Sequence, residues 1–268
     1  MKKAVKIIGI VLAVLVGLEL LLQGYILLEE KKREKAPGNA AEYAYELTPK
    51  NENTVLSGKR IVFLGSSVTF GAAAEGQSFV EYLVHRDGVD AIKEAKSGTT
   101  LVDKTSFFAL IAFGNGESYI KRLKKIDSAE KVDCVVVQLS TNDATMKLPL
   151  GEIGEGKTLS DFDTKTVTGA MEYIIRYAKD TWNCPVAFYT GAYYKSAPYA
   201  AMVNRLRELK DKWDVGVIDL FTDVAFNDID EETYALYMFD PIHPTKAGYR
   251  DWWGPEIEKQ LALFLKED

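Results

Sequence analysis

The residues of this sequence best suited to chemistry are two hydroxyls, a carboxylate and an imidazole. Asp240 precedes His243 by three positions, so one turn can bring its carboxylate to one ring nitrogen and leave the other for a serine hydroxyl. A serine activated in this way attacks acyl carbonyls. The candidate nucleophile is Ser67, in the Gly-Ser-Ser-Val-Thr stretch of residues 65–69, and its neighbour Ser66 is the rival hydroxyl.

The choice of a base is narrow because the chain has only two histidines. His85 lies in an amphipathic pattern with no acidic or hydroxyl pattern around it, so we expect it at the surface or at its boundary. An alternative interpretation of Asp240 and Pro241 is that they begin a helix, since Asp and Pro are common at helix N-termini. That interpretation leaves His243 unexplained, so we take His243 as the candidate base and Asp240 as the residue that orients it.

Two further stretches could stabilise negative charge on a reacting carbonyl oxygen. Gly98 lies in Ser-Gly-Thr-Thr, and Asn142 lies in Ser-Thr-Asn-Asp. Both stretches are typical of turns. A backbone N–H at Gly98 and the side-chain amide of Asn142 are also suitable donors to an oxyanion, because both donate without carrying charge.

The elements that must position these residues follow from short apolar runs that alternate with longer amphipathic stretches. Strands are expected at 61–65, 90–95, 132–140, 185–191 and 215–220. Helices are expected at 78–86, 117–126, 166–182, 199–213 and 246–266. This alternation predicts a three-layer α/β domain, with a parallel sheet covered on both faces. The candidate residues follow strands of this sheet, where ligands bind in such folds.

Taken together, the chain resembles the SGNH or GDSL hydrolase family over residues 58 to 265. The four sequence blocks of that family supply, in this order, a nucleophile, two oxyanion donors and an Asp-x-x-His pair. The resemblance implies a flavodoxin-like, five-stranded α/β/α fold. It places the nucleophile at Ser67 rather than Ser66, with Asp240 and His243 completing the triad. It also implies an oxyanion hole formed by the backbone N–H groups of Ser67 and Gly98 with the side chain of Asn142.

Two positions depart from the family pattern. The Asp that usually precedes the nucleophile is Ser66, and the Gly that usually stands two residues before the oxyanion Asn is Ser140. Neither position holds a reacting group. The departures therefore bear on loop geometry and substrate fit rather than on the triad.

The activity that the resemblance implies is that of a serine carboxylester hydrolase without metal or organic cofactor. Its substrate would be a small acyl ester, and by analogy an acylated glycan at the cell surface or imported into the cell. Tyr193 and Tyr194 follow the fourth expected strand and could line the substrate site. Two alternatives remain open: an acyltransferase that uses the same triad, and a catalytically silent, anchored binding module.

The first part of the chain differs from the rest. Residues 7–28 are apolar except for Glu19 and Gln23, and about 20 such residues span a bilayer as a helix. No small-x-small cleavage site follows, so we expect an uncleaved signal anchor over residues 1–28. Residues 29–57 are charged and broken by proline and glycine, which predicts a linker. The hydrolase domain is then expected over 58–268.

The orientation of this anchor is finely balanced, because lysines and arginines flank the apolar run on both sides. A lysine-rich start followed at once by an apolar run is typical of export signals, so we expect a single-pass anchor with the catalytic domain outside the cytoplasm. Cys134 and Cys184 are expected to be small core residues. In an oxidising compartment they could instead form one disulfide.

Composition excludes one class of partner. The net charge is −6 and there is no basic block, so nucleic acid is not an expected partner. Residues 151–158 match the phosphate-loop pattern letter for letter. The match begins about ten residues after the nearest expected strand and includes Glu152 and Glu155, so we interpret it as a solvated loop. The sequence carries no signal of oligomeric state.

Overall fold

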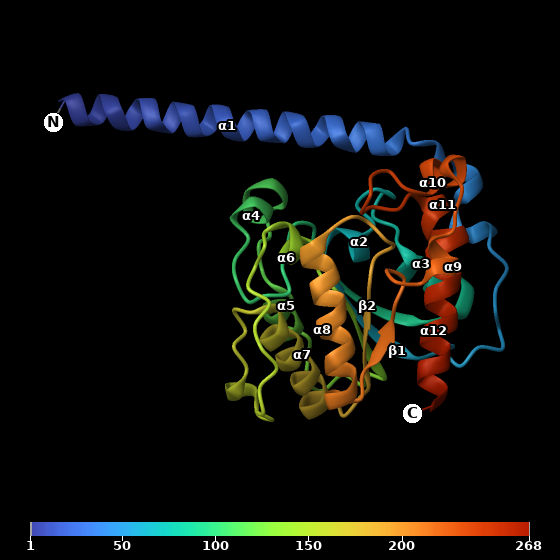
Figure 1. Ribbon diagram of the computed structural model, residues 1–268. Helices are drawn as coiled ribbons and strands as arrows, with labels where there is room; N and C mark the ends of the chain where they lie inside the picture. The colour runs from blue at the N-terminus through green and yellow to red at the C-terminus, as the bar shows by residue number, and fades with distance from the viewer. Residues whose placement is uncertain (1, 268) are drawn as a thin grey trace.

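The computed structural model describes residues 2–267 and contains one five-stranded sheet with helices on both faces (Figure 1). All neighbouring strands are parallel, and their order is β2-β1-β3-β4-β5. The strands are β1 (Arg60–Gly65), β2 (Asp90–Ala95), β3 (Cys134–Gln138), β4 (Val186–Tyr189) and β5 (Gly216–Ile218). The predicted fold class is confirmed, and the last three strands are shorter than expected.

The longer helices begin and end at residues that satisfy backbone groups. Ser78 and Glu81 form a capping box at the start of α3, and Gly88 ends that helix in a left-handed conformation. The helices are α1 (Lys2–Glu34), α2 (Ser67–Phe70), α3 (Phe79–Asp87), α4 (Phe107–Phe113), α5 (Tyr119–Leu123), α6 (Thr141–Thr145), α7 (Val167–Trp182), α8 (Ala197–Trp213), α9 (Val224–Asn227), α10 (Glu231–Tyr237), α11 (Lys246–Gly248) and α12 (Gly254–Glu267). Shorter turns are the 3-10 turns η1 (Pro37–Asn39), η2 (Ala41–Tyr43), η3 (Tyr45–Leu47) and η4 (Leu159–Asp161), and the π-helical turn η5 (Tyr249–Trp253).

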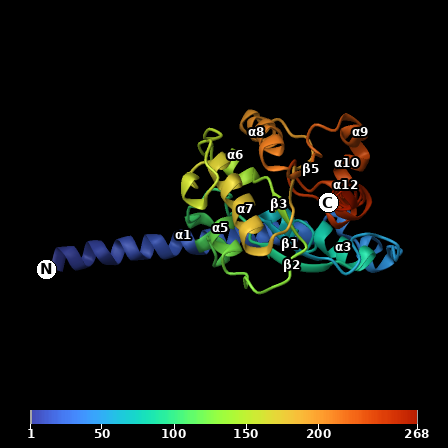
Figure 2. The same ribbon diagram turned by 90° about the horizontal axis from the view of Figure 1, so that it is seen from below.

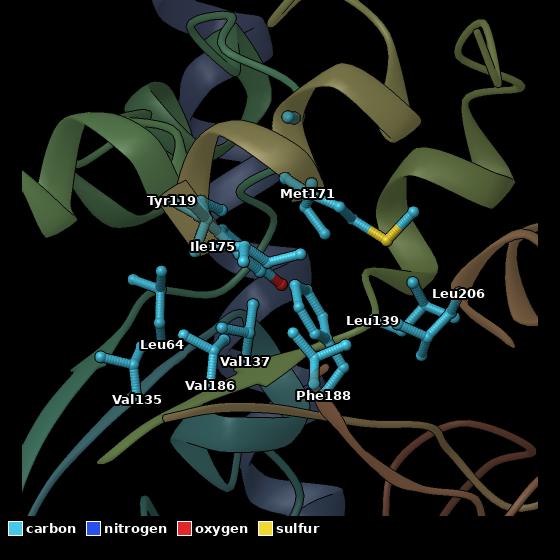
Figure 3. Packing of buried hydrophobic residues seen from close by; sticks show 14 of the residues in the cluster. Leu64, Tyr119, Val135, Val137, Leu139, Met171, Ile175, Val186, Phe188 and Leu206 are labelled. Atoms are coloured by element: carbon cyan, nitrogen blue, oxygen red, sulfur yellow. The ribbon is translucent and has the colours of Figure 1, made fainter. Parts of the chain in front are cut away.

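The core has two halves because successive side chains of a strand point to opposite faces. Val62 and Leu64 of β1 pack on the face covered by α5, α7 and α8, whereas Ile61 and Phe63 pack against α3 and α12. Figure 3 shows the first half, in which strand side chains such as Val137 and Phe188 meet Met171, Ile175 and Leu206. The sheet is therefore covered on both faces, and its carboxyl edge is left for the site.

Two elements differ from the prediction. The single helix expected over 246–266 is divided into α11, η5 and α12. A β-carbon on Gly254 would lie 2.5 Å from the carbonyl oxygen of Tyr249 and 2.8 Å from the ring of Tyr82, so the backbone passes too close to its neighbours for another residue. In addition, α4 lies between the strand expected at 90–95 and the helix expected at 117–126, where no element was expected.

The segment expected to be a linker, residues 29–57, also differs. α1 continues to Glu34, and three 3-10 turns follow it. Asn39, Tyr45 and Leu56 are each at most 5% exposed. These few buried side chains lie among charged ones, which is why composition alone predicted a spacer. The segment packs on the domain.

α1 is apolar over most of its length and extends along one edge of the domain and beyond it (Figures 1 and 2). Residues Ile10–Glu34 are long and apolar enough to cross a membrane, and this part of α1 is not buried in the protein. Such a helix could be a membrane anchor or a signal sequence. Its last turns pass over the carboxyl edge of the sheet, where the candidate residues lie (Figure 1).

The two cysteines occupy neighbouring parts of the core. Cys134 begins β3 and Cys184 lies just before β4, and both are buried. Cys184 is a free thiol whose pKa burial raises to about 11. The disulfide between Cys134 and Cys184 that the sequence left open is therefore absent from this structure.

Candidate active site

Ser67 is the first residue of α2, directly beyond the end of β1. The turn between them needs Gly65, because a β-carbon there would lie 1.7 Å from Oγ1 of Thr69. Ser67 is 8% exposed, so its hydroxyl lies at the surface of the fold without projecting from it. The structure thus presents this serine at the carboxyl edge of the sheet.

Gln138, the last residue of β3, fixes the loop that carries Ser67. Its Oε1 accepts hydrogen bonds from the backbone N–H groups of Ser66 and Thr69, at 2.9 and 3.2 Å, and from the Thr69 hydroxyl at 2.8 Å. Sequence reasoning missed this residue. The available signal was a polar side chain at the end of an otherwise apolar buried strand.

Asp240 and His243 lie in a tight turn beside Ser67. The turn is closed by an antiparallel bridge between Met238 and Pro244. Nδ1 of His243 lies 2.8 Å from Oδ2 of Asp240, and Nε2 lies 2.8 Å from Oγ of Ser67. The structure therefore brings the three candidate residues into one hydrogen-bonded chain, and the imidazole contacts Ser67 rather than the rival Ser66.

The charge state of Asp240 follows from its surroundings. Burial opposes ionisation of this carboxylate, but hydrogen bonds from the His243 side chain and from the backbone N–H groups of Ile242 and His243 outweigh it, and the pKa of Asp240 is lowered. An ionised carboxylate only accepts hydrogen bonds. Nδ1 of neutral His243 must therefore donate to Asp240, which leaves Nε2 to accept from the Ser67 hydroxyl.

The candidate oxyanion donors surround the same hydroxyl. Gly98 has φ of +73°, a left-handed conformation that glycine adopts without strain. Among the described residues, neither the N–H of Ser67 nor that of Gly98 has a hydrogen-bond acceptor. Asn142 donates one amide hydrogen to the carbonyl of Thr99 at 2.8 Å and keeps the other. Three donors are thus available to an added ligand.

Asp143 stabilises the loop that carries Gly98 through hydrogen bonds to its backbone. Its carboxylate accepts the backbone N–H groups of Leu101 and Val102, at 2.9 and 3.0 Å. Burial raises the pKa of Asp143 to about 6 despite these hydrogen bonds. Because Asp143 follows Asn142, one turn of α6 carries one candidate oxyanion donor and fixes the loop of the other candidate, Gly98.

Arg122 joins the loops after β1 and β2. Its guanidinium donates to the carbonyl of Gly65 at 2.7 Å, to the Thr99 hydroxyl at 3.2 Å and to the carbonyl of Glu94. It is 1% exposed, and burial lowers its pKa. Sequence reasoning missed Arg122, because nothing in the amphipathic pattern around it shows that it is buried.

A cavity of about 290 Å³ opens above these residues. Besides Ser67, Asp240, His243, Gly98 and Asn142, its walls include side chains from two elements that sequence analysis did not connect with the site. Those side chains are Tyr25, Ile26, Glu29 and Arg33 of α1, and Phe108 and Phe113 of α4.

The two tyrosines expected to line the substrate site lie elsewhere. Tyr193 is 57% exposed and lines a separate hollow with Phe221 and Val224. Tyr194 packs against Tyr199 and Phe221 and lines a small separate cavity of about 10 Å³ with Val68, Pro241 and Ile242. Neither lines the cavity at Ser67, which Phe108 and Phe113 enclose instead.

Other candidate sites in the sequence do not form. The phosphate-loop match lies in a surface loop, where Asp161 already accepts the backbone N–H groups of Lys157 and Thr158 that a phosphate would need. His85 is half-buried and contacts the carbonyl of Thr48. No group of three or more His, Cys, Asp or Glu side chains in the described part of the chain could hold a metal ion.

Known structures share this fold at low sequence identity. A protein from Lactobacillus plantarum matches with 20% identity and a TM-score of 0.58, over 79% of this chain and 98% of the other. A GDSL-like protein from Bacteroides ovatus matches with 18% identity and a TM-score of 0.53, over 79% and 100%. An acetylxylan esterase from Geobacillus stearothermophilus matches with 17% identity and a TM-score of 0.51, over 79% and 96%. Comparison with curated proteins gave no match.

A comparison with family models identifies the chain more directly. The model of the GDSL-like lipase/acylhydrolase family matches residues 63–250. The match begins in β1, just before Ser67, and ends beyond His243, so it includes every residue of the hydrogen-bonded chain described above. This protein belongs to the GDSL-like lipase/acylhydrolase family.

Proposed function

We propose that this protein is a serine carboxylester hydrolase in which Ser67 is the nucleophile, His243 the general base and Asp240 the residue that orients the base. The observation that carries the proposal is the pair of 2.8 Å contacts of His243, one to Ser67 and one to Asp240. A carboxylate, an imidazole and a hydroxyl in this order can transfer the hydroxyl proton during attack on an ester. The family is a family of acylhydrolases, in agreement with this chemistry.

In the proposed mechanism, Oγ of Ser67 attacks the ester carbonyl while Nε2 of His243 takes its proton. The N–H groups of Ser67 and Gly98 and the amide of Asn142 bind the oxyanion. His243 then protonates the leaving alcohol, and an acyl-enzyme on Ser67 remains. Water, deprotonated by His243, attacks the acyl-enzyme and releases the acid and the free serine.

We further propose that the acyl group is small. The proposal is supported by the large side chains of Phe108 and Phe113, which line the same cavity as Ser67. One structural neighbour is an acetylxylan esterase, and by analogy an acetyl ester of a glycan is one candidate substrate for this chain.

We also propose that α1 is retained as a single-pass anchor and that the domain lies outside the cytoplasm. The length and apolar composition of Ile10–Glu34 support the span. The lysine-rich start followed at once by the apolar run supports the orientation. Retention is supported by the side chains that α1 contributes to the cavity.

The test is hydrolysis of 4-nitrophenyl acetate by the full chain and by Ser67→Ala. We expect the substitution to reduce kcat by at least about 10³-fold, because the remaining groups cannot form an acyl-enzyme. A serine-directed phosphonate should add its mass to the wild-type protein at Ser67 and leave Ser67→Ala unmodified.

Ser66→Ala is the matched control, since it removes the neighbouring hydroxyl that does not contact His243. It should retain kcat within about tenfold. Equal activity of wild type and Ser67→Ala, or phosphonate attached at Ser66, would overturn the assignment.

A further inference from the structure

The helix α4 exposes its large apolar side chains and buries its small ones, the reverse of what is expected for a helix surrounded by water. Its two alanines, Ala109 and Ala112, are the residues buried against the domain. The other five residues are large, apolar and exposed: Phe107 by 73%, Phe108 by 51%, Leu110 by 45%, Ile111 by 51% and Phe113 by 44%. Contiguous exposed apolar surface of this kind marks an interaction with a protein or a membrane.

The exposed face of α4 is held in place. The hydroxyl of Ser106 accepts the N–H of Ala109 at 3.2 Å and caps the helix, and Gly114 ends it with φ of +70°. The N–H of Ser106 donates to the carbonyl of Gly116 at 2.8 Å, which closes the base of the loop. The five apolar side chains are therefore presented by a fixed element.

What lies beside α4 is the candidate membrane span. Nε2 of Gln23 in α1 donates to the carbonyl of Ile111 at 3.2 Å, and the two helices run side by side at this point (Figure 1). Residues 7 to 23 of the apolar run rise about 24 Å along a helix. The hydrocarbon core of a bilayer is about 30 Å thick. Gln23 lies five residues, about 7.5 Å of helix rise, before the end of the apolar run at Leu28, so Ile111 meets α1 in the half of the span nearer the domain.

The cavity at Ser67 is lined by residues from both α1 and α4. Tyr25 and Ile26 of α1 and Phe108 and Phe113 of α4 form its apolar walls, between the triad and the exposed face of α4. One and two turns further along α1, Glu29 and Arg33 line the same cavity. The side chains that α1 contributes to the wall therefore change from apolar to charged along the helix, an arrangement that suits an amphiphilic substrate.

Arg33 can recognise the polar part of such a substrate. Its guanidinium donates to the carbonyl of Ala72 at 3.3 Å and lies over the ring of Phe239. Its Nε is buried out of reach of a ligand, whereas its Nη2 is not buried and has no acceptor among the described residues. An unused, charged donor in the wall of the cavity favours a ligand with an acceptor, such as an ester or phosphate oxygen.

We propose that α4 is an interfacial helix that lies in the same leaflet as the end of the α1 span, and that the active site takes acyl esters held in that leaflet. The substrate enters between α1 and α4, with its apolar chain in the bilayer and its polar part near Arg33. The substrate class rests on the proposed hydrolase function, whereas the position of α4 does not.

The activity test compares one acyl group in two settings, with the full chain in nanodiscs. Octadecyl acetate is held in the bilayer, and ethyl acetate is dissolved in water; acetate release is measured for both. The variant Phe107→Ser/Leu110→Ser/Ile111→Ser changes exposed side chains of α4 that do not line the cavity. We expect it to cleave octadecyl acetate at least about tenfold more slowly and ethyl acetate within twofold of wild type.

The matched control is Leu47→Ser/Val224→Ser/Leu263→Ser, which removes three apolar side chains exposed by 65%, 83% and 52% in other parts of the domain. It should leave both rates unchanged. Equal losses on both esters in the α4 variant, or no loss on octadecyl acetate, would overturn the proposed route of the substrate.

The position of α4 is tested separately, by a nitroxide attached at Phe107→Cys and, as a control, at Leu263→Cys. The native cysteines are buried and should not take the label. We expect collisions with oxygen to dominate at residue 107 and collisions with a water-soluble nickel chelate to dominate at residue 263. Equal nickel accessibility at the two positions would overturn the interfacial assignment. If wild type cleaves neither ester, the hydrolase proposal fails, and this measurement still decides the position of α4.

Discussion

At the scale of the residue, Asp240 determines which nitrogen of His243 carries the proton. Its pKa is lowered by hydrogen bonds that outweigh burial, so it remains an acceptor. A carboxylate fixes the imidazole with Nδ1 protonated, and only this tautomer can take a proton from Ser67 at Nε2. The consequence is measurable without altering Ser67 or His243.

We expect Asp240→Asn to lower kcat by about 10³–10⁴-fold with little change in KM, because an amide can donate to Nδ1 and so favour the wrong tautomer. Steady-state hydrolysis of 4-nitrophenyl acetate measures both constants. The control is Asp228→Asn, which changes an exposed carboxylate away from the cavity. A loss smaller than tenfold, or one confined to KM, would contradict the assigned role.

The sequence predicted the residues that the structure brings together at this site, because each reacting type is rare or stands at the end of a strand. His243 could be chosen from two histidines, and Asp240 by its spacing. The supporting residues Gln138 and Arg122 could not be predicted in this way. Their roles depend on backbone carbonyl and N–H groups that come close only after the sheet has formed.

At the scale of the element, α6 controls the loop after β2 through Asp143. Burial raises the pKa of Asp143 to about 6, above the ordinary value of about 3.9. Between these two values the folded protein holds a proton that the unfolded chain has released. The contribution of Asp143 to stability therefore decreases as the pH rises from about 4 to about 6.

Asp143→Asn should remove this dependence, since an amide does not titrate. We expect the difference in unfolding free energy, wild type minus variant, to fall with rising pH by at most about 1.4 kcal/mol per unit between pH 4 and 6. Denaturant unfolding in nanodiscs, followed by tryptophan fluorescence, gives this difference. Asp228→Asn serves as control, and curves for wild type and Asp143→Asn that stay parallel across this range would contradict the prediction.

The elements themselves were predictable to different degrees. β1 and β2 were located almost to the residue, since both begin and end beside turn-forming residues. α4 was missed because an amphipathic pattern identifies a helix by its polar face, and Phe107–Phe113 has none. Residues 37–57 were missed because a few buried side chains hold them to the domain amid charged neighbours.

At the scale of the whole molecule, the domain and its N-terminal helix form one site. Nothing in the sequence predicted that Tyr25 or Arg33 would line a cavity with Ser67, because α1 and β1 are joined by a segment that composition describes as a spacer. Removal of α1 as a signal peptide would open one wall of that cavity. The proposed function and the proposed retention of the helix are therefore linked.

We expect the membrane-bound protein to keep its N-terminal helix and to expose its domain outside the cytoplasm. Intact mass spectrometry of the purified protein measures the first, and fusions at the C-terminus measure the second. In a bacterial host, an alkaline phosphatase fusion should be active and a green fluorescent protein fusion dark. A mass that lacks the first 28 or more residues would contradict retention, and the reverse pair of signals would contradict the orientation.

Asn39 links the end of α1 to two other segments beside the candidate active site, the loop after α2 and the start of α11. Its amide donates to the carbonyls of Arg33 and Ala73, each at 2.7 Å, and its oxygen accepts the N–H of Lys246 at 2.8 Å. Asn39 is 5% exposed, so Asn39→Ala would leave the carbonyl of Ala73 and the N–H of Lys246 without partners, whereas the carbonyl of Arg33 keeps the N–H of Ala36. We expect the variant to lose about 2–4 kcal/mol of unfolding free energy, measured by denaturant unfolding in nanodiscs. Asn53→Ala, at an exposed position, should lose less than about 0.5 kcal/mol. If the two variants are equally stable, α1 is not held to the domain through this amide, and the wall that it forms over Ser67 must be fixed by other contacts.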